Sequence, residues 1–169
     1  RVNLGFNPER LLTFRVEIGW ASPWAPQEKN REFHQRVLEK LRALPGVRAV
    51  TFDPNLPLSG KPREPSVFSA ERQGPDERLR NPYLNQHVVG PDYFSTLGIR
   101  LLRGRDFSPD DRPATPAVVI VSRSLAERLW PGADPIGQRL QPSPTTTPDV
   151  WFTVIGIAEN VLHHELDAA

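Results

Sequence analysis

Two amino acids are missing from this chain of 169 residues, which has no cysteine and no methionine. The lack of cysteine leaves the redox compartment open, because an oxidising periplasm permits disulfides but does not require them. The lack of methionine means that the sequence does not begin at a natural start. We therefore expect the chain to be a fragment excised from a longer protein.

Long apolar runs and an excess of charge of one sign are also missing. No run reaches the roughly 18 apolar residues that a membrane span requires, and the first residues carry no signal-peptide pattern. The net charge of +1 gives no electrostatic reason to propose nucleic acid, since a nucleic-acid-binding protein usually shows a basic face. The sequence predicts a soluble domain without a nucleic-acid partner.

Proline, in contrast, is abundant. The 19 prolines are more than twice the usual share of about 5%, and they favour loops, edge strands and short helices. The hydrophobic content of 38% is enough for one substantial core or two small ones.

The first third of the chain has the pattern of a strand, a helix and a second strand. Leu11–Ile18 alternates apolar and polar residues, which predicts a strand whose apolar face is made by Leu12, Phe14, Val16 and Ile18. Pro26 opens a predicted helix that ends near Leu44, with an apolar stripe of Phe33, Val37, Leu41 and Leu44. Val47–Phe52 is the second predicted strand, and the three elements form a βαβ unit with a right-handed crossover.

A proline-rich connector, Asp53–Pro65, marks the expected boundary between two subdomains. Beyond it, strands are predicted at Ser66–Glu71 and Tyr83–Val89. Trp151–Ile157 is the most strand-like run of the chain, and we expect it to pair with Gly137–Gln141 as a long β-hairpin.

The segment between Asn85 and Leu140 organises the rest, because turn residues recur in it at short intervals. Pro91 is placed where a first helical turn tolerates a missing N–H, and Gly98 where a helix end requires a positive φ. The residues between them give this single helical turn one apolar face, made by Tyr93, Phe94 and Leu97.

A charged turn with a glycine follows at Arg103–Phe107. We expect Arg103 or Arg105 to pair with Asp106 or with a neighbouring backbone carbonyl, and Phe107 to be buried. This segment is therefore predicted to be a structural brace.

The next elements are a short buried strand, Ala117–Val121, and a helix. Ser122 or Ser124 is expected to cap the helix, and Glu127 completes a capping box with Ser124. The buried face of this helix is predicted to consist of Leu125, Leu129 and Trp130, and the helix to end at Pro131 and Gly132.

Three stretches of the sequence carry a family resemblance: GPDYFSTLGIRLLRGRDF, VVIVSRSLAERLWPGADPIGQRL and FTVIGIAENV. In this order and spacing they closely resemble the MacB-like periplasmic core domain of ABC-transporter permeases of the MacB/FtsX type. The resemblance runs from Gly5 to about Leu166, and the fit is closest to large orphan permeases of acidobacterial type, which have no fused ATPase.

The resemblance implies an α+β fold with two subdomains. Residues 1–56 would be the first half of a porter-type subdomain of split βαβ arrangement, whose second half follows later in the parent chain. Residues 57–169 would be a mainly β, Sabre-like subdomain with short helices. The residues that we single out as structural motifs are Gly90, Tyr93, Phe94, Gly98, Gly104, Arg105, Asp106, Phe107, Trp130, Pro131, Gly137 and Gly156.

The resemblance also implies a function: a non-enzymatic domain on the periplasmic side of the bacterial inner membrane, without a cofactor. Such domains couple ATP-driven motion of the transmembrane helices to export or to a periplasmic partner. The implied partners are the parent's own transmembrane helices, a separate ATPase subunit, and a periplasmic or outer-membrane protein. Because the second half of the porter subdomain is missing, we also expect the fragment to self-associate through exposed strand edges.

Several residues are of types that could bind a metal or act in catalysis, but each has a simpler structural explanation. His163, His164, Glu165 and Asp167 lack a metal-ligand spacing, and adjacent histidines in a strand point to opposite faces, so a polar surface segment is the better interpretation. Four carboxylates could serve acid–base chemistry: Asp106, Asp110, Asp111 and Glu127. Arginines lie beside those of the turn, at Arg103, Arg105 and Arg112, and ion pairs across the turn explain the same residues as a structural brace.

A nucleophile or a nucleotide site finds no more support. Ser122, Ser124 and His87 are not part of a G-x-S-x-G elbow. Gly98, Gly104, Gly132 and Gly137 do not have the spacing of a phosphate-binding loop, and we expect the domain not to bind ATP.

Two tryptophans, Trp20 and Trp24, leave two roles open. They are either partly buried against the first helix or a contact surface for a partner or for the bilayer headgroups. Two other functions also stay open for the whole chain: a secreted ligand- or peptide-binding sensor domain, and a hydrolase accessory domain.

Overall fold

The computed structural model describes residues 4–16, 27–53, 66–108, 110–111, 115–143 and 150–161. Its helices are α1 (Gln27–Arg42), α2 (Pro75–Arg78), α3 (Tyr93–Leu97) and α4 (Arg123–Leu129). Its strands are β1 (Ser66–Ala70), β2 (Tyr83–Leu84), β3 (Leu101–Gly104), β4 (Val118–Ser122), β5 (Arg139–Ser143) and β6 (Phe152–Ala158). The α+β class is confirmed.

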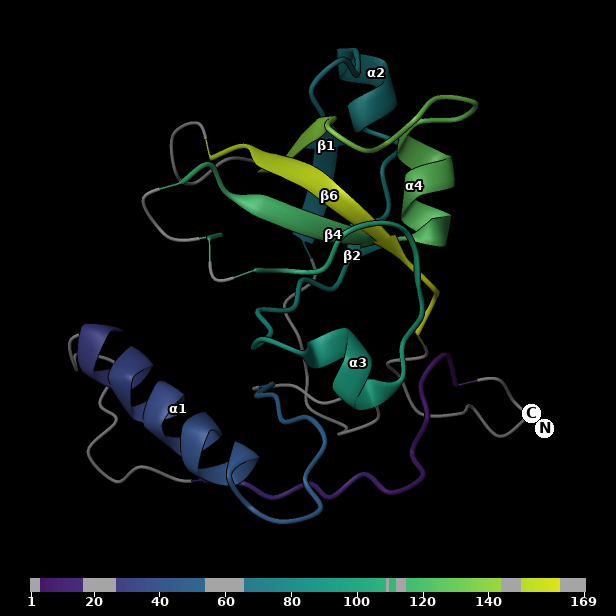
Figure 1. Cartoon of the computed structure of the whole chain (residues 1–169). Helices are drawn as coiled ribbons and strands as arrows, with labels where there is room; N and C mark the ends of the chain where they lie inside the picture. The colour runs from purple at the N-terminus through teal and green to yellow at the C-terminus, as the bar shows by residue number, and fades with distance from the viewer. Residues whose placement is uncertain are drawn as a thin grey trace.

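The six strands form one sheet in the order β2-β1-β5-β6-β3, in which all neighbours are antiparallel. The remaining strand, β4, lies outside this order. It pairs with β6 along the edge opposite β5 and β3 and runs parallel to it. The predicted hairpin is confirmed, since Arg139 and Leu140 of β5 pair with Thr153 and Phe152 of β6. Because β6 has neighbours on both edges, it is the central strand (Figure 1).

The two faces of β6 contribute to two separate hydrophobic clusters. Ile157 belongs to the first cluster, together with Phe68, Val121, Ala126, Leu140 and Val154. Ala158 belongs to the second, together with Tyr93, Phe94, Leu97 and Ile99. Successive side chains of a strand point to opposite faces, so α4 closes one face of the sheet through Ala126, and α3 closes the other.

Helix α4 is capped at its N-terminus by one of the two predicted serines. Ser122 is the N-cap, and its Oγ accepts a hydrogen bond from the Leu125 N–H at 3.3 Å. The predicted capping box of Ser124 and Glu127 is wrong, because Ser124 is the second residue of the helix and Leu125 the third. Ala126 and Leu129 are buried, and Leu125 and Trp130 are half-buried against the first cluster.

The predicted βαβ unit is wrong for the residues that the structure describes. The helix is present as α1 (Gln27–Arg42), but residues 11–16 and 47–53 form no strand. Arg10, at φ 59°, bends the chain just before the first of these segments. A strand needs a partner for its backbone N–H and C=O groups, and neither segment has a neighbouring strand in the described part of the chain.

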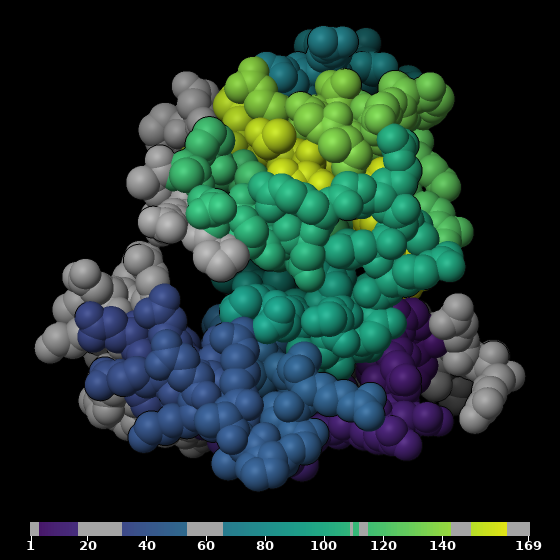
Figure 2. All heavy atoms as spheres, in the orientation of Figure 1, coloured from purple at the N-terminus to yellow at the C-terminus, as the bar shows by residue number. Residues whose placement is uncertain are grey.

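The N-terminal segments form a layer of their own, which we call the N-terminal layer (residues 4–16 and 27–53). It lies along one end of the sheet unit (residues 66–161), and α3 lies between the two (Figure 1). The space-filling view shows the blue and purple atoms of this layer directly below the teal atoms of the sheet unit and in contact with them (Figure 2). The predicted boundary at residues 56 and 57 lies outside the described residues.

Candidate functional site

Helix α3 is a five-residue turn with a left-handed residue at each end. Asp92, the N-cap, has φ 57°, and Gly98, the C-cap, has φ 65°. The predicted apolar face is confirmed, since Tyr93, Phe94 and Leu97 are all buried. Pro91 lies before the helix rather than in its first turn. Because its apolar face is locked into the second cluster, α3 is fixed to the sheet unit.

One N-terminal segment is attached to the C-terminal end of α3. The Asn7 N–H donates to the Leu97 carbonyl at 2.8 Å. A Cβ at Gly98 would lie 3.0 Å from the Cβ of Asn7, so glycine serves there both the positive φ and the close approach. Phe6 and Leu11 pack against the second cluster from the same segment.

A second N-terminal segment is attached just before α3, through Gly90. The Gly90 N–H donates to the Phe52 carbonyl at 2.8 Å. A Cβ at Gly90 would lie 2.9 Å from the Phe52 nitrogen, a separation that a real side chain does not reach. The Phe52 ring also stacks on His34 of α1, with ring centroids 4.5 Å apart. Gly90 was expected to matter for structure, and its partner explains why it has no side chain.

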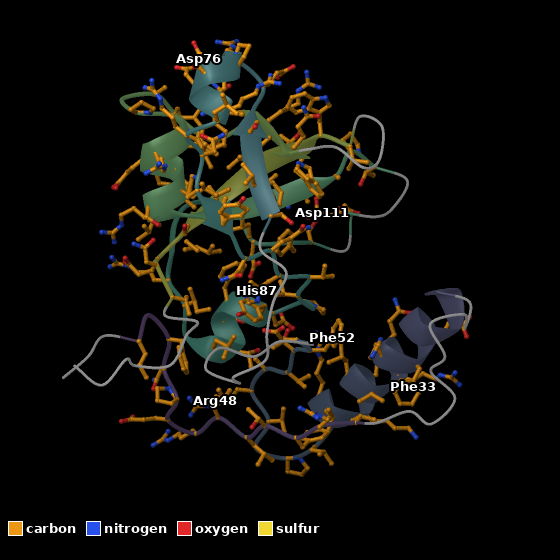
Figure 3. The ribbon with its side chains drawn as sticks, turned by 180° about the vertical axis from the view of Figure 1, so that it is seen from behind. Phe33, Arg48, Phe52, Asp76, His87 and Asp111 are labelled. Carbon is orange, nitrogen blue, oxygen red and sulfur yellow. The ribbon has the colours of Figure 1, made fainter. Side chains whose placement is uncertain are left out.

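An ion pair and a histidine–carboxylate contact flank this joint. Arg42, the last residue of α1, places Nη2 2.6 Å from Oδ2 of Asp92. His87 places Nδ1 4.0 Å from Oδ2 of Asp53, whose side chain is fully buried. In Figure 3, His87 lies beside α3 and Phe52 lies between α3 and α1. We call the contacts made by Asn7, Arg42, Phe52 and Asp53 with residues 87–98 the α3 junction.

The predicted arginine–aspartate brace is present, with Asp111 as the carboxylate. Arg105 donates Nη1 and Nη2 to the two carboxylate oxygens of Asp111, both at 2.8 Å. Its Nη1 also donates to the Asp106 carbonyl at 3.0 Å, which confirms the predicted backbone partner. The Ser108 N–H donates to Asp111 at 2.8 Å. The Arg105 hydrogen bond, followed by that from Ser108, lowers the pKa of Asp111 to about 2.

The brace stands on a close approach of β3 and β6. A Cβ at Gly104, which has φ 78°, would lie 2.1 Å from the Ile155 carbonyl oxygen, and one at Gly156 would lie 2.7 Å from the Arg105 carbonyl oxygen. The Arg105 N–H donates to the same Ile155 carbonyl at 2.9 Å. Glycine is therefore required at both positions. Phe107 is half-buried rather than buried and packs against the second cluster.

Other arginines of the sheet unit also hold carboxylates. Arg103 donates to Asp134 at 2.6 Å, and Arg139 donates to Glu71. Arg100 and Arg123 both bind Glu159. The Ile136 backbone N–H and Arg103 lower the pKa of Asp134, and Arg139 lowers that of Glu71. Carboxylates that are held ionised in this way are braces rather than general acids.

The remaining predicted residues are spread over the sheet unit. Trp130 and Gly132 follow α4, and Pro131 between them is exposed. Gly137, at φ 81°, donates its N–H to the Val154 carbonyl at 2.8 Å. Trp20, Trp24 and His163 to Asp167 lie outside the described residues, as does Arg112.

Within the described ranges, no group of three or more His, Asp or Glu side chains could hold a metal ion. Among the same residues, no helix has both the length and the apolar character to cross a membrane. An open groove of about 590 Å³ lies beside β2 and α4, lined by Pro82, Leu84, Ser122, Ser124, Leu125, Glu127 and Arg128.

Sequence reasoning missed the partners that form the α3 junction. Arg42 and Asp92 are separated by 50 positions, and the contact of Phe52 with Gly90 is also non-local. One signal was available: Gly90 and Gly98 bracket α3, and a glycine at a non-helical position is typical of a close backbone approach. The sequence does not say which segment approaches.

The geometry defines a class of protein: an α+β domain in which arginines brace carboxylates and two layers meet at the α3 junction. The comparisons give the family. The model of the MacB-like periplasmic core domain matches residues 8–165, so this chain belongs to that family and is a periplasmic domain of an ABC-type permease. Members of this family are not typically enzymes. The closer affinity to acidobacterial permeases stays a prediction.

Two solved structures share the fold. The periplasmic region of MacB from Actinobacillus actinomycetemcomitans is 17% identical with a TM-score of 0.54, and the match covers 78% of this chain and 52% of that one. The extracellular domain of the noncanonic ABC-type transporter YknZ from Gram-positive bacteria is 16% identical with a TM-score of 0.51, over 78% of this chain and 60% of that one. The chain thus matches little more than half the length of these relatives. No curated protein matches it.

Proposed function

We propose that this domain couples motion of the permease's transmembrane helices, driven by a separate ATPase subunit, to export or to a periplasmic partner. The observation that carries the proposal is the α3 junction. Two N-terminal segments meet the sheet unit at opposite ends of one short helix, through the contacts of Asn7 with Leu97 and of Phe52 with Gly90. A displacement of the N-terminal layer therefore acts on the sheet through α3.

The packing of α3 supports this role. Tyr93, Phe94 and Leu97 are buried in the second cluster, which includes Ala158 of the central strand. Close-packed cores transmit displacement rather than absorb it. At Gly90 the two backbones are in direct contact, so the N-terminal layer pivots there against α3, while α3 itself stays fixed to the sheet unit. The absence of cysteine from the sequence makes this domain convenient for site-directed labels.

The test is a distance measurement in the full permease, reconstituted with its ATPase subunit. Spin labels are attached at cysteines that replace Arg36 on α1 and Glu127 on α4, two exposed positions on opposite sides of the junction. Pulsed electron resonance then compares the nucleotide-free and ATP-bound states. We expect the distance distribution between these labels to change when ATP binds.

A matched label pair within the sheet unit serves as the control. Asp76 on α2 and Glu127 on α4 are both exposed, and their distance should stay the same in both states. If the two pairs respond alike, or if neither responds, the domain does not flex at the α3 junction and the coupling proposal fails.

A second candidate function, peptide binding, is favoured by the groove beside β2. Its floor is partly apolar, through Leu84 and Leu125, and β2 is an edge strand of only two residues. An extended peptide could add to such an edge. In an amide titration with a peptide from a periplasmic partner, shifts confined to Leu84 and Leu125 would support this function over the coupling role.

A further inference from the structure

Asp92 stands at the N-cap of α3 without capping it. Its backbone lies in the left-handed region, with φ 57° and ψ 19°, and its side chain makes no hydrogen bond to its own helix. An aspartate that caps a helix normally has an extended backbone and accepts a hydrogen bond from the N–H of the second or third helical residue. Here the carboxylate is directed instead to Arg42 of α1, at 2.6 Å.

The backbone of Asp92 is strained in this state. Residues other than glycine and asparagine rarely adopt a positive φ, although aspartate tolerates it better than most. A proline followed by a residue of positive φ is the arrangement of a type II turn, in which glycine or asparagine usually takes the second place. The chain thus accepts a local conformational cost at Asp92, which the contact with Arg42 offsets in part.

A second resting state is available to the same residue. The first N–H groups of any helix have no acceptor within the helix, and in α3 the third helical residue is Ser95. If Asp92 returned to a negative φ, its carboxylate would be in the ordinary position to accept from the Ser95 N–H. That movement would carry the carboxylate away from Arg42.

We propose that Asp92 is a two-position switch, which binds either Arg42 of the N-terminal layer or the Ser95 N–H of its own helix. When Asp92 binds Arg42, the last turn of α1 is held against α3. When Asp92 caps α3 instead, the last turn of α1 is released. Gly90 lies two residues upstream, so the turn that moves is the one that carries the contact with Phe52.

The balance between the two states is expected to be close. The side chains of Arg42 and Asp92 are 41% and 48% exposed, and ion pairs with that exposure contribute little and are screened by salt. A capping hydrogen bond is of similar strength. A modest displacement of α1 would therefore be enough to change the partner of Asp92.

Amide hydrogen exchange of the 169-residue chain, followed by NMR, tests the switch. Arg42→Ala removes one of the two partners, and we expect the exchange of the Ser95 amide to slow by roughly fivefold as Asp92 caps the helix. Arg36→Ala is the matched control, since Arg36 is exposed on the same helix and, among the described residues, donates to the Glu32 carbonyl of its own helix. It should leave Ser95 unchanged.

Two further measurements assign the effect to Asp92. In the wild-type chain, about 0.5 M salt should slow Ser95 exchange in the same direction, because the ion pair is screened. In the double variant Arg42→Ala, Asp92→Ala, the protection should be lost. An unchanged Ser95 amide in Arg42→Ala, or protection that persists without Asp92, would overturn the proposal.

The use of this switch during transport rests on the proposed coupling function, but the switch itself rests on the geometry of α3. The two can fail separately. Exchange data that overturn the switch would leave the spin-label result untouched, and a rigid junction in the permease would leave the capping equilibrium of the chain to be measured on its own.

Discussion

The sheet unit and the N-terminal layer share a sequence pattern that predicts strands, but only the sheet unit forms them among the described residues. Both contain segments of alternating or continuous apolar residues that predict strands. In the sheet unit, β6 finds neighbours on both edges. In the N-terminal layer, Leu12, Phe14 and Val16 remain 86%, 59% and 50% exposed. The comparison teaches that alternation identifies an apolar face, but only a neighbouring backbone turns that face into a strand.

The two regions also differ in how tightly their backbones approach each other. Gly104 and Gly156 lie where β3 and β6 leave no room for a Cβ, whereas Gly46 in the N-terminal layer has no atom within 4 Å of a built Cβ. Stability in a protein is rarely uniform, and regions with few buried contacts open first. We expect the sheet unit to carry most of the free energy of unfolding.

The largest effect is predicted for Gly104→Ala. The new Cβ would meet the Ile155 carbonyl oxygen at 2.1 Å, and the backbone has φ 78°. We expect a loss of at least about 3 kcal/mol in the free energy of unfolding, because steric conflict adds to the strain of a positive φ. Denaturant titration measures it.

Gly46→Ala is the matched control for that substitution. It has a similar φ of 85° but open space around the position, so only the conformational strain of about 1 kcal/mol is expected. Equal denaturation midpoints for the two variants would contradict the idea that close backbone approach is what distinguishes the sheet unit.

The next effect compares two apolar side chains. Leu97 is 2% exposed in the second cluster, and Leu97→Ala should cost about 2–5 kcal/mol, as for other core leucines. Phe14→Ala removes a larger side chain that is 59% exposed, and the change should stay within about 0.5 kcal/mol. Thermal unfolding of both variants decides between them. A Phe14→Ala variant as unstable as Leu97→Ala would show that the N-terminal layer is packed in solution.

The elements of the sheet unit could be predicted from the sequence because their signals are local. The buried face of α3 and the positive φ of Gly98 depend on residues within a few positions of one another. The paired residues of the β5–β6 hairpin are separated by only 12 and 14 positions, Leu140 with Phe152 and Arg139 with Thr153. The predicted capping box at Ser124 was wrong. Two possible caps, Ser122 and Ser124, lie within three residues, and the tertiary packing of α4 selects Ser122.

The α3 junction could not be predicted because its contacts are non-local. Nothing near Asp92 in the sequence indicates that its carboxylate binds Arg42 rather than its own helix. Likewise, Arg105 has Asp106 as its neighbour, yet its side chain reaches Asp111, because the backbone of β3 holds the guanidinium over the following turn. The sequence favours a pairing of charges, and the path of the backbone selects the partner.

A smaller effect is predicted for the brace, and it depends on pH. The pKa of Asp111 is lowered from 3.8 to about 2 by Arg105, so the carboxylate stabilises the folded state fully above pH ~4. That contribution is lost as the pH falls through the folded-state pKa. Since the Arg105 side chain is 51% exposed, we expect about 1–2 kcal/mol at neutral pH after allowance for solvent screening.

Asp111→Asn tests this contribution. The variant should be less stable than the wild-type chain at pH 7, and the difference between them should shrink steadily between pH 4 and pH 2. Asp76→Asn on α2 is the control, because Asp76 is exposed. A stability difference that is constant down to pH 2 would mean that Asp111 acts through its shape and not through its charge.

The smallest effect on stability is expected from self-association of the N-terminal layer. Residues 11–16 form neither helix nor strand and present three exposed apolar side chains, Leu12, Phe14 and Val16, and such unpaired segments tend to recruit another chain. Two copies that pair antiparallel around Phe14 would bring Leu12 of each opposite Val16 of the other, and all six side chains would lie on one face. Exchange between identical chains is a common route to dimers.

Six residues make a weak interface, so the dissociation constant should be in the range of about 0.1–1 mM. At a protein concentration of a tenth of that value, mass action adds less than about 0.1 kcal/mol to the free energy of unfolding, so self-association is measured through the molecular mass alone.

Light scattering over a tenfold concentration range should show the mass rising for the wild-type chain and for Leu79→Lys, which changes a side chain of 85% exposure in the sheet unit. Phe14→Lys should stay monomeric, because it places two charges opposite each other at the centre of the pair. A constant monomer mass for the wild-type chain, with the amides of Leu12 and Phe14 strongly protected from exchange, would mean that the segment pairs within its own chain, and the contrast between the two regions would then be smaller than the structure indicates.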